Sequence, residues 1–326
     1  MLAVVCMSYG GPEVAQVRDV PEPVPTDNEV LVRVHAFTVT SGDCRMRASN
    51  FPSGFWLPAR LMLGVRRPRQ PILGTACAGT VEAIGARVAK WRTGDPVVVF
   101  SGVRFGCHAQ FTTMKEDGAL ALRPAGFTFE QAAAIPFGGA TALYFLRDIG
   151  KVKGGERVLV NGASGSVGSA AVQLAKHFGA HVTGVCSAAN AGLVRSLGAD
   201  EMIDYNSIDF ANAGERWDII LDTIGNAPFS RCRAALNENG RLLLIAAGLA
   251  DLVKAPFQSK ASGLTVAGGP APERADDLAL LAGLCEQGAF KPVIDGTYPL
   301  ARVVEAFARA DSGRKTGDVV VSVAQS

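Results

Sequence analysis

The sequence has almost no net charge, and this shortage argues against a nucleic-acid-binding protein. Its 32 Lys and Arg residues nearly balance its 30 Asp and Glu residues, which leaves a net charge of +2. Binding to nucleic acid normally requires a strong basic excess on one face. The densest basic segment, residues 60–69, mixes its arginines with Pro and Leu and is interpreted as a solvated loop. We therefore expect no nucleic-acid partner.

Paired cysteine motifs and long hydrophobic runs are also missing. The seven cysteines are odd in number, scattered and never spaced as C-x-x-C, which argues against a disulfide framework or a zinc ribbon and indicates a reducing compartment. The apolar start, residues 1–6, is too short for a signal sequence. No run approaches the roughly 18 apolar residues that span a bilayer. We expect a cytoplasmic protein with no membrane partner.

The length and composition of the chain indicate two domains. With 326 residues, 48% of them hydrophobic, the chain is too long for one ordinary core and too apolar to be disordered. In its first part, short segments bounded by Gly or Pro predict β-strands. These strands are expected at 30–36, 79–85, 95–100 and 109–113. Residues 44–72, rich in Pro, Arg and aromatic residues, are interpreted as an insertion or lid.

The pattern changes near residue 128. Thr128, with Gln131 at the third position after it, predicts a capping box that opens a helix. A second helix is expected from Thr141 to Ile149, and strands then alternate with helices, which predicts a doubly wound parallel sheet. The strands are expected at 157–160, 181–185, 201–204, 217–222, 241–245 and 264–266. Helices are expected after 275 and over 301–311, and the terminal strand 319–323 is expected to return to the first domain.

A glycine turn joins the first of these strands to its helix. It consists of Gly162, Ala163, Ser164, Gly165, Ser166, Val167 and Gly168, with the spacing G-x-x-G-x-x-G. Glycines let the backbone approach a pyrophosphate, and the N–H groups at a helix start stabilise its charge. The alternative is a tight strand–helix turn that has only a structural role and binds no ligand. The strand–turn–helix context favours a dinucleotide site.

The choice of dinucleotide depends on the end of the next strand. An NAD site usually has an acidic residue there to accept from the ribose 2′-hydroxyl, and this chain has Ser187. A 2′-phosphate would meet no like charge at Ser187, so NADPH is the predicted cofactor. Asn190, Tyr205 and Arg314 complete the predicted adenosine end. Arg195 and Lys315 are the remaining basic candidates, and each of these residues is alternatively an ordinary surface residue.

Longer motifs follow one another along the whole chain. They are GTACAGTVEAIG at 74–85, WRTGDPV at 91–97, GCHAQF at 106–111, AAAIPFGGATA at 132–142, LGADEMIDY at 197–205 and GDVV at 317–320. In this order they resemble the medium-chain dehydrogenase/reductase superfamily, in its zinc-free quinone oxidoreductase-like branch. The resemblance implies an α/β fold with a GroES-like, mostly-β catalytic domain at 1–123 and 275–326 and a Rossmann NADP(H)-binding domain at 124–274. It also implies a homodimer through the Rossmann edge strand, here 264–268.

Because of this resemblance, the zinc-ligand positions of zinc-dependent relatives can be compared with this chain one at a time. Where zinc-dependent relatives have their first cysteine ligand, three residues before an Asp, this chain has Thr40 before Asp43. Thr75 stands in their G-H-E box, and Phe137 lies in the region of their third ligand. Residues 95–113 contain only Cys107, so the four-cysteine structural lobe is also absent. Two threonines and a phenylalanine do not bind zinc, and we predict no metal site.

Without a Lewis acid, reduction of a conjugated carbonyl is favoured over alcohol oxidation. The branch implies that Thr40 and Asp43 line the cleft as catalytic candidates, with Asp43 alternatively a local helix cap. Thr141 should approach the nicotinamide or its ribose. The chain after strand 241–245 supplies Ala246, Ala247 and Gly248 at the carboxyl edge of the sheet, where cofactors bind. Phe257 and Lys260 are expected on the following loop, where they would cover the nicotinamide or simply face solvent.

The predicted function is NADPH-dependent hydride transfer to a small-molecule quinone, enone or related conjugated carbonyl. Three alternatives stay open. One is reduction of an enoyl thioester, for which arginines between 60 and 69 could bind a phosphate. Another is a nucleotide-binding protein with little turnover. The last is metal-free alcohol or aldehyde chemistry.

Overall fold

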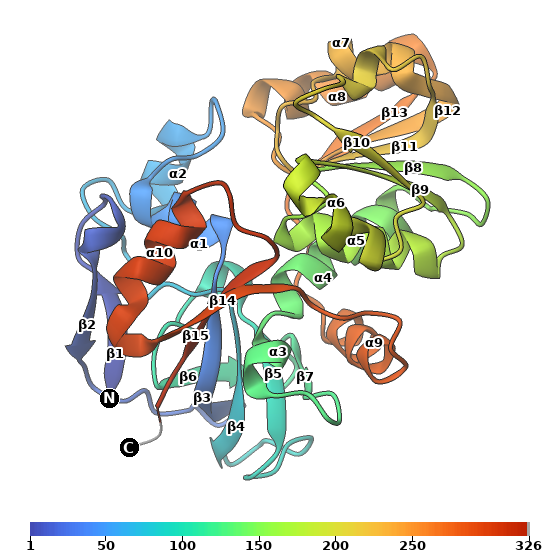
Figure 1. The fold of residues 1–326 in the computed structure, drawn as a ribbon. Coiled ribbons are helices and arrows are strands. Elements are labelled where there is room, and N and C mark those ends of the chain that lie inside the picture. The colour runs from blue at the N-terminus through green and yellow to red at the C-terminus, as the bar shows by residue number, and fades with distance from the viewer. Residues whose placement is uncertain (325–326) are drawn as a thin grey trace.

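A computed structural model describes residues 1–324, and its first sheet is organised around one long strand (Figure 1). Strand β3 (Glu29–Val39) pairs antiparallel with β4 (Ala76–Ile84), β6 (Phe111–Lys115) and β15 (Asp318–Ser322). The sheet runs in the order β14-β15-β3-β4-β5-β7. Its other strands are β5 (Pro96–Phe100), β7 (Leu120–Leu122) and β14 (Ile294–Pro299). Strand β15 thus joins the end of the chain to the N-terminal part, as the sequence predicts.

Smaller elements surround this sheet. A hairpin of β1 (Leu2–Cys6) and β2 (Ala15–Asp19) packs beside helix α10 (Val303–Asp311). The predicted strand at 109–113 begins two residues later, because β6 starts at Phe111. The interval 44–72 is not one irregular loop: it contains the end of α1 (Ser41–Ala48) and all of α2 (Trp56–Leu63).

The second sheet is parallel and six-stranded, in the order β10-β9-β8-β11-β12-β13. Its strands are β8 (Arg157–Asn161), β9 (His181–Cys186), β10 (Glu201–Asp204), β11 (Trp217–Asp222), β12 (Leu236–Leu244) and β13 (Thr265–Gly268). This is the predicted Rossmann-type sheet, with β13 at one edge. Together with the GroES-like first sheet it confirms the predicted fold class.

Successive side chains of these strands point to opposite faces of the sheet, so helices must pack on both faces to bury the apolar residues. Val158 and Val160 pack with the helices of one core, whereas Leu159 packs with those of the other. The first face is covered by α4 (Pro136–Leu143), α5 (Ser166–His177) and α6 (Ala191–Ser196). The second is covered by α7 (Phe229–Cys232) and α8 (Leu249–Ser262).

The two sheets meet at α4, which lies between them in Figure 1. The capping box of Thr128 and Gln131 opens α3 (Phe129–Ala133), as predicted. The second helix begins earlier than expected, at Pro136, and continues as a π-helix over Tyr144–Ile149. Helix α9 (Ala275–Glu286) packs on α4 and β7, and its Leu278, Leu281 and Leu284 belong to the same core as α5. Single-turn 3₁₀ helices lie at Pro12–Val14, Gly102–Arg104, Ala188–Asn190, Phe210–Asn212, Arg233–Ala235 and Leu300–Arg302.

Within residues 1–324, no helix has both the length and the apolar character needed to cross a bilayer.

Candidate functional site

The glycine turn is a tight cradle at the start of α5. Gly162 has a φ of +85°, a conformation that side chains rarely adopt, and a Cβ on Gly168 would lie 2.0 Å from the Gly162 carbonyl oxygen. Gly165 is the N-cap residue of α5. The first N–H groups of an α-helix have no partner within the helix and are available to an anion. The turn therefore fits the pyrophosphate of a dinucleotide, and Ala163, Ser166 and Gly168 complete its wall.

An outer cavity of about 830 Å³ adjoins this turn. It collects residues that are far apart in the sequence but were predicted to form one site: Gly162, Ser164, Gly165, Ser187, Asn190, Tyr205 and Arg314. Ser187 follows directly on β9. The Asn190 side-chain amide donates to Ser164 Oγ over 3.1 Å, which ties the end of this strand to the glycine turn.

The basic side chains of the outer cavity come from two segments. Arg314 and Lys315 stand just before β15, where the Gly317 N–H donates to the Ser164 carbonyl over 2.8 Å. Arg231, which the sequence reasoning missed, lies on α7 and forms an ion pair with Asp209 at 2.7 Å. The Arg314 side chain has no hydrogen-bond or ion-pair partner among residues 1–324 and is available to a ligand. Arg195 does not line the cavity.

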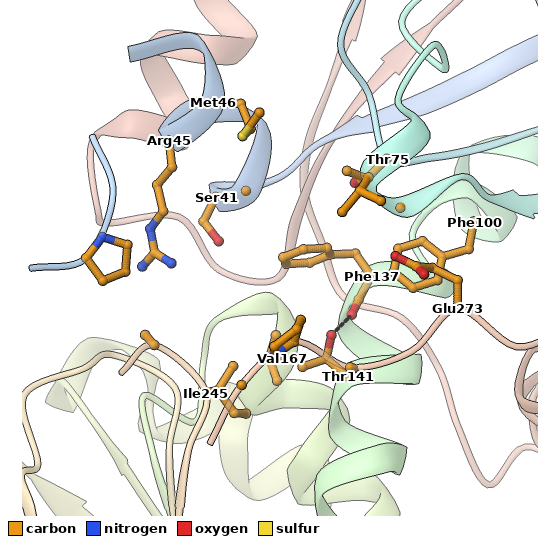
Figure 2. A pocket seen from close by; sticks show the side chains of 18 of the residues that line it. Ser41, Arg45, Met46, Thr75, Phe100, Phe137, Thr141, Val167, Ile245 and Glu273 are labelled. Carbon is orange, nitrogen blue, oxygen red and sulfur yellow. Dashed lines mark hydrogen bonds between the residues drawn. The ribbon is translucent and has the colours of Figure 1, made fainter. Parts of the chain in front are cut away.

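An inner cavity of about 350 Å³ lies where the two sheets face each other (Figure 2). Thr141, Val167 and Ala246, all predicted cofactor residues, line it together with Ile245. The Thr141 hydroxyl donates to the Phe137 carbonyl over 2.7 Å, so α4 fixes its position. The opposite wall comes from α1, whose Ser41, Arg45 and Met46 side chains stand across the gap in Figure 2.

Two charged side chains of the inner cavity, Arg45 and Glu273, were not among the residues predicted from the sequence. Among the described residues, Arg45 supplies the only cationic side chain in the lining of the inner cavity, and its guanidinium has no hydrogen-bond or ion-pair partner. Figure 2 shows it extending from α1 toward the strand end that carries Ile245. Burial lowers the pKa of its guanidinium, which nevertheless stays charged at neutral pH. An unpaired cation in a mostly apolar cavity is positioned to donate to a carbonyl oxygen or an anion.

Thr40 and Asp43 do not line the cavity. Both are buried, and together they form the capping box of α1: Asp43 Oδ2 accepts from the Thr40 N–H at 2.8 Å and from the Thr40 hydroxyl at 2.7 Å. His108 Nε2 lies 3.8 Å from the same carboxylate oxygen, and burial lowers the pKa of His108. The geometry therefore supports the alternative that Asp43 is a local cap and does not support substrate contact by this pair.

The described residues do not assemble a zinc site. No group of three or more His, Cys, Asp or Glu side chains suited to a metal occurs within residues 1–324. The seven cysteines are all buried, and burial raises the pKa of Cys232 and Cys285 to about 12. Thr75, in the expected ligand position, lines the inner cavity, and its buried hydroxyl has no hydrogen-bond partner among the described residues.

The segment after β12 differs from the prediction in its secondary structure. Phe257 and Lys260 lie on α8, not on a loop, and line neither of these cavities. Gly248 is the N-cap residue of that helix. Pro256, inside the helix, obscured it in the sequence because proline usually ends or kinks a helix. Lys260 is therefore too far along α8 to be retained as a cofactor residue.

Known proteins resemble this chain over nearly its whole length. Residues 26–147 match the alcohol dehydrogenase GroES-like domain and residues 197–321 match the zinc-binding dehydrogenase domain. The chain is 33% identical to a chloroplast envelope quinone oxidoreductase homolog of Arabidopsis thaliana, over 96% of each protein. The quinone oxidoreductase of Coxiella burnetii superposes with a TM-score of 0.88 at 26% identity, covering 99% of both chains. A mycobacterial protein solved in complex with NADPH superposes with a TM-score of 0.83 at 28% identity, again covering 99% of both chains.

Proposed function

Because this chain belongs to the quinone oxidoreductase-like branch of the medium-chain dehydrogenase/reductase superfamily, and is thus an oxidoreductase of that kind, we propose that it transfers a hydride from NADPH to a conjugated carbonyl without zinc. The acceptor class is a quinone, an enone or a related electron-poor alkene. The observation that carries the proposal is the inner cavity itself. It sets Thr141 and Val167 of the nucleotide domain opposite the unpaired Arg45 of the other domain.

The residues of the inner cavity have different roles in the proposed reaction. When bound, NADPH supplies the hydride. Thr141, Val167 and Ile245 would form the floor that holds its reactive ring beside the acceptor. As the hydride adds to the conjugated carbon, the electron pair moves to the carbonyl oxygen, where Arg45 stabilises the charge by hydrogen bonding. A proton from water then completes the reduction.

The outer cavity supports NADPH over NADH. Ser187 places no carboxylate where a 2′-phosphate would lie, and Arg314, Lys315 and Arg231 bring three basic side chains to the same cavity. A phosphate gains charge-assisted hydrogen bonds from such groups. Asp209 is the only acidic side chain among the described lining residues, and its ion pair with Arg231 offsets its charge.

A panel of acceptors tests this function. NADPH oxidation should be followed with benzoquinone, ethyl vinyl ketone, crotonyl-CoA and an aldehyde, and with NADH in place of NADPH. The proposal expects turnover with the first two acceptors. Turnover confined to crotonyl-CoA would support the enoyl-thioester alternative. Tight NADPH binding without oxidation in any mixture would support a nucleotide-binding protein with little turnover.

We also propose that the protein forms a homodimer through β13. This strand is the edge of the parallel sheet, and an unpaired edge offers N–H and C=O groups to a second copy. Sedimentation equilibrium should give twice the chain mass of 34.0 kDa. Thr265→Lys places a charge on that edge and should yield monomer, whereas a monomeric parent protein would contradict the proposal.

A further inference from the structure

A second cavity adjoins the inner one, and its lining has no charged side chain. It has a volume of about 510 Å³. The residues common to both linings are Met46, Phe51, Pro52, Val103, Phe105, Ile245, Gly269 and Pro270. The second cavity also has walls of its own, formed by Phe55, Pro58, Ala59, Met62, Leu63, Ala247 and Leu252. We call this second cavity the tail channel.

Both domains build the tail channel. One wall is the lid segment, where Ala59 and Met62 stand on α2. The other wall is the start of α8, which carries Leu252. The Leu249 N–H donates to the Ser53 carbonyl over 2.8 Å, and this hydrogen bond joins the lid segment to the nucleotide domain.

The two cavities differ in what they can bind. The inner cavity, at about 350 Å³, must hold both the reactive end of the cofactor and the head group that it reduces. Any longer substituent on that head group has to leave the inner cavity, and the tail channel adjoins it along eight residues. An alkyl chain gains free energy by burial there. The amides of a pantetheine arm would instead lose hydrogen bonds against walls that lack polar side chains.

We propose that the tail channel binds the apolar tail of the substrate, so that this protein prefers conjugated carbonyls carrying a long alkyl chain. This inference rests on the proposed function, because it takes the inner cavity as the place of hydride transfer. Each methylene that enters the channel should raise kcat/KM by up to about fourfold until the channel is full.

A chain-length series tests the channel. The value of kcat/KM should be measured with NADPH for vinyl ketones from ethyl to nonyl vinyl ketone. In the parent protein it should rise with length and then level off. Ala59→Trp fills the channel from α2 and Leu252→Trp fills it from α8. Each should remove the advantage of the nonyl ketone, a loss of at least about tenfold, and leave ethyl vinyl ketone within about twofold.

Leu61→Trp is the matched control, because Leu61 lies on the same helix, is 58% exposed and lines neither cavity. It should keep the full dependence on chain length. If kcat/KM of the parent protein does not change with chain length while ethyl vinyl ketone is reduced well, the proposed role of the tail channel is wrong and the proposed function stays intact. If no vinyl ketone is reduced, calorimetric binding of nonyl methyl ketone against ethyl methyl ketone to the NADPH-loaded protein replaces the rates. Equal affinities would then overturn the channel as well.

Discussion

Thr40 and Asp43 form reciprocal hydrogen bonds at the start of α1. The Thr40 hydroxyl donates to Asp43 Oδ2 over 2.7 Å, and the Asp43 backbone N–H donates back to that hydroxyl over 3.1 Å. Both residues are fully buried, and the helix that they begin carries Ser41, Arg45 and Met46 into the inner cavity. The pair therefore acts on the site through the position of α1.

Thr40→Ala should lower stability more than it lowers the rate of the chemical step. Loss of the cap should reduce the free energy of unfolding by about 1–2 kcal/mol, and kcat should stay within a few-fold of the parent value. Urea unfolding and steady-state kinetics measure the two effects, and Thr40→Ser, which keeps the hydroxyl, is the control. A loss of kcat of a hundredfold or more at full stability would restore the catalytic role predicted from the sequence.

Arg45→Met should lower kcat/KM by about a hundredfold, because a charge-stabilising donor is removed from the cavity. The dissociation constant of NADPH should not change, since Arg45 belongs to the wall opposite the nucleotide domain. Fluorescence titration and acceptor kinetics separate these quantities. Arg92→Met, an exposed arginine outside both sites, is the control for loss of charge. Unchanged kcat/KM in Arg45→Met would remove this residue from the mechanism.

Arg314→Ala should weaken NADPH binding by about fivefold and leave NADH binding unaffected, because only NADPH carries the phosphate that this side chain would contact. Ser187→Asp should reverse the preference toward NADH by adding an acceptor for the ribose hydroxyl and repelling the phosphate. Arg195→Ala, an exposed change that lies outside the outer cavity, is the matched control. Equal effects of Arg314→Ala on both nucleotides would place the phosphate elsewhere.

Asp318 should make stability depend on pH. Burial raises the pKa of this carboxyl from 3.8 to about 6, against the lowering effect of Lys315. The folded state thus binds the proton more tightly than the unfolded state. The resulting stability is fully present below about pH 4 and is lost as the pH rises through about 6.

The variant Asp318→Asn removes this titration. Relative to the parent protein, it should gain up to about 3 kcal/mol of unfolding free energy between about pH 4 and pH 8. Urea unfolding at the two pH values measures the difference, and Asp117→Asn, an exposed change, should show no such gain. A difference from the parent protein that is the same at both pH values would contradict the assignment.

Local patterns predicted much of this structure. Apolar runs gave the strands of the parallel sheet, and the glycine spacing predicted the turn that Gly162 and Gly168 form. Ser187, Tyr205 and Arg314 also meet in one cavity as expected. The glycine turn and Ser187 follow from neighbours in the sequence and from the regular order of a parallel sheet, whereas Arg314 reaches the cavity from just before β15, a strand of the other sheet.

Other features depended on contacts that the sequence does not display. Arg231 enters the outer cavity because α7 follows β11. This strand neighbours β8 in the sheet although 55 residues separate Asn161 from Trp217. The role of Arg45 depends on which face of α1 turns toward the nucleotide domain. Lys260 was expected on a loop because proline usually ends a helix, but α8 continues through Pro256 and includes Lys260.

The central claim is metal-free hydride transfer to a conjugated carbonyl in the inner cavity. NADPH oxidation with benzoquinone and ethyl vinyl ketone should be measured on protein of known zinc content, before and after dialysis against a chelator. The account predicts turnover that the chelator does not change, with far less than one zinc per chain. Absence of turnover, or loss of turnover together with one zinc removed per chain, would contradict it.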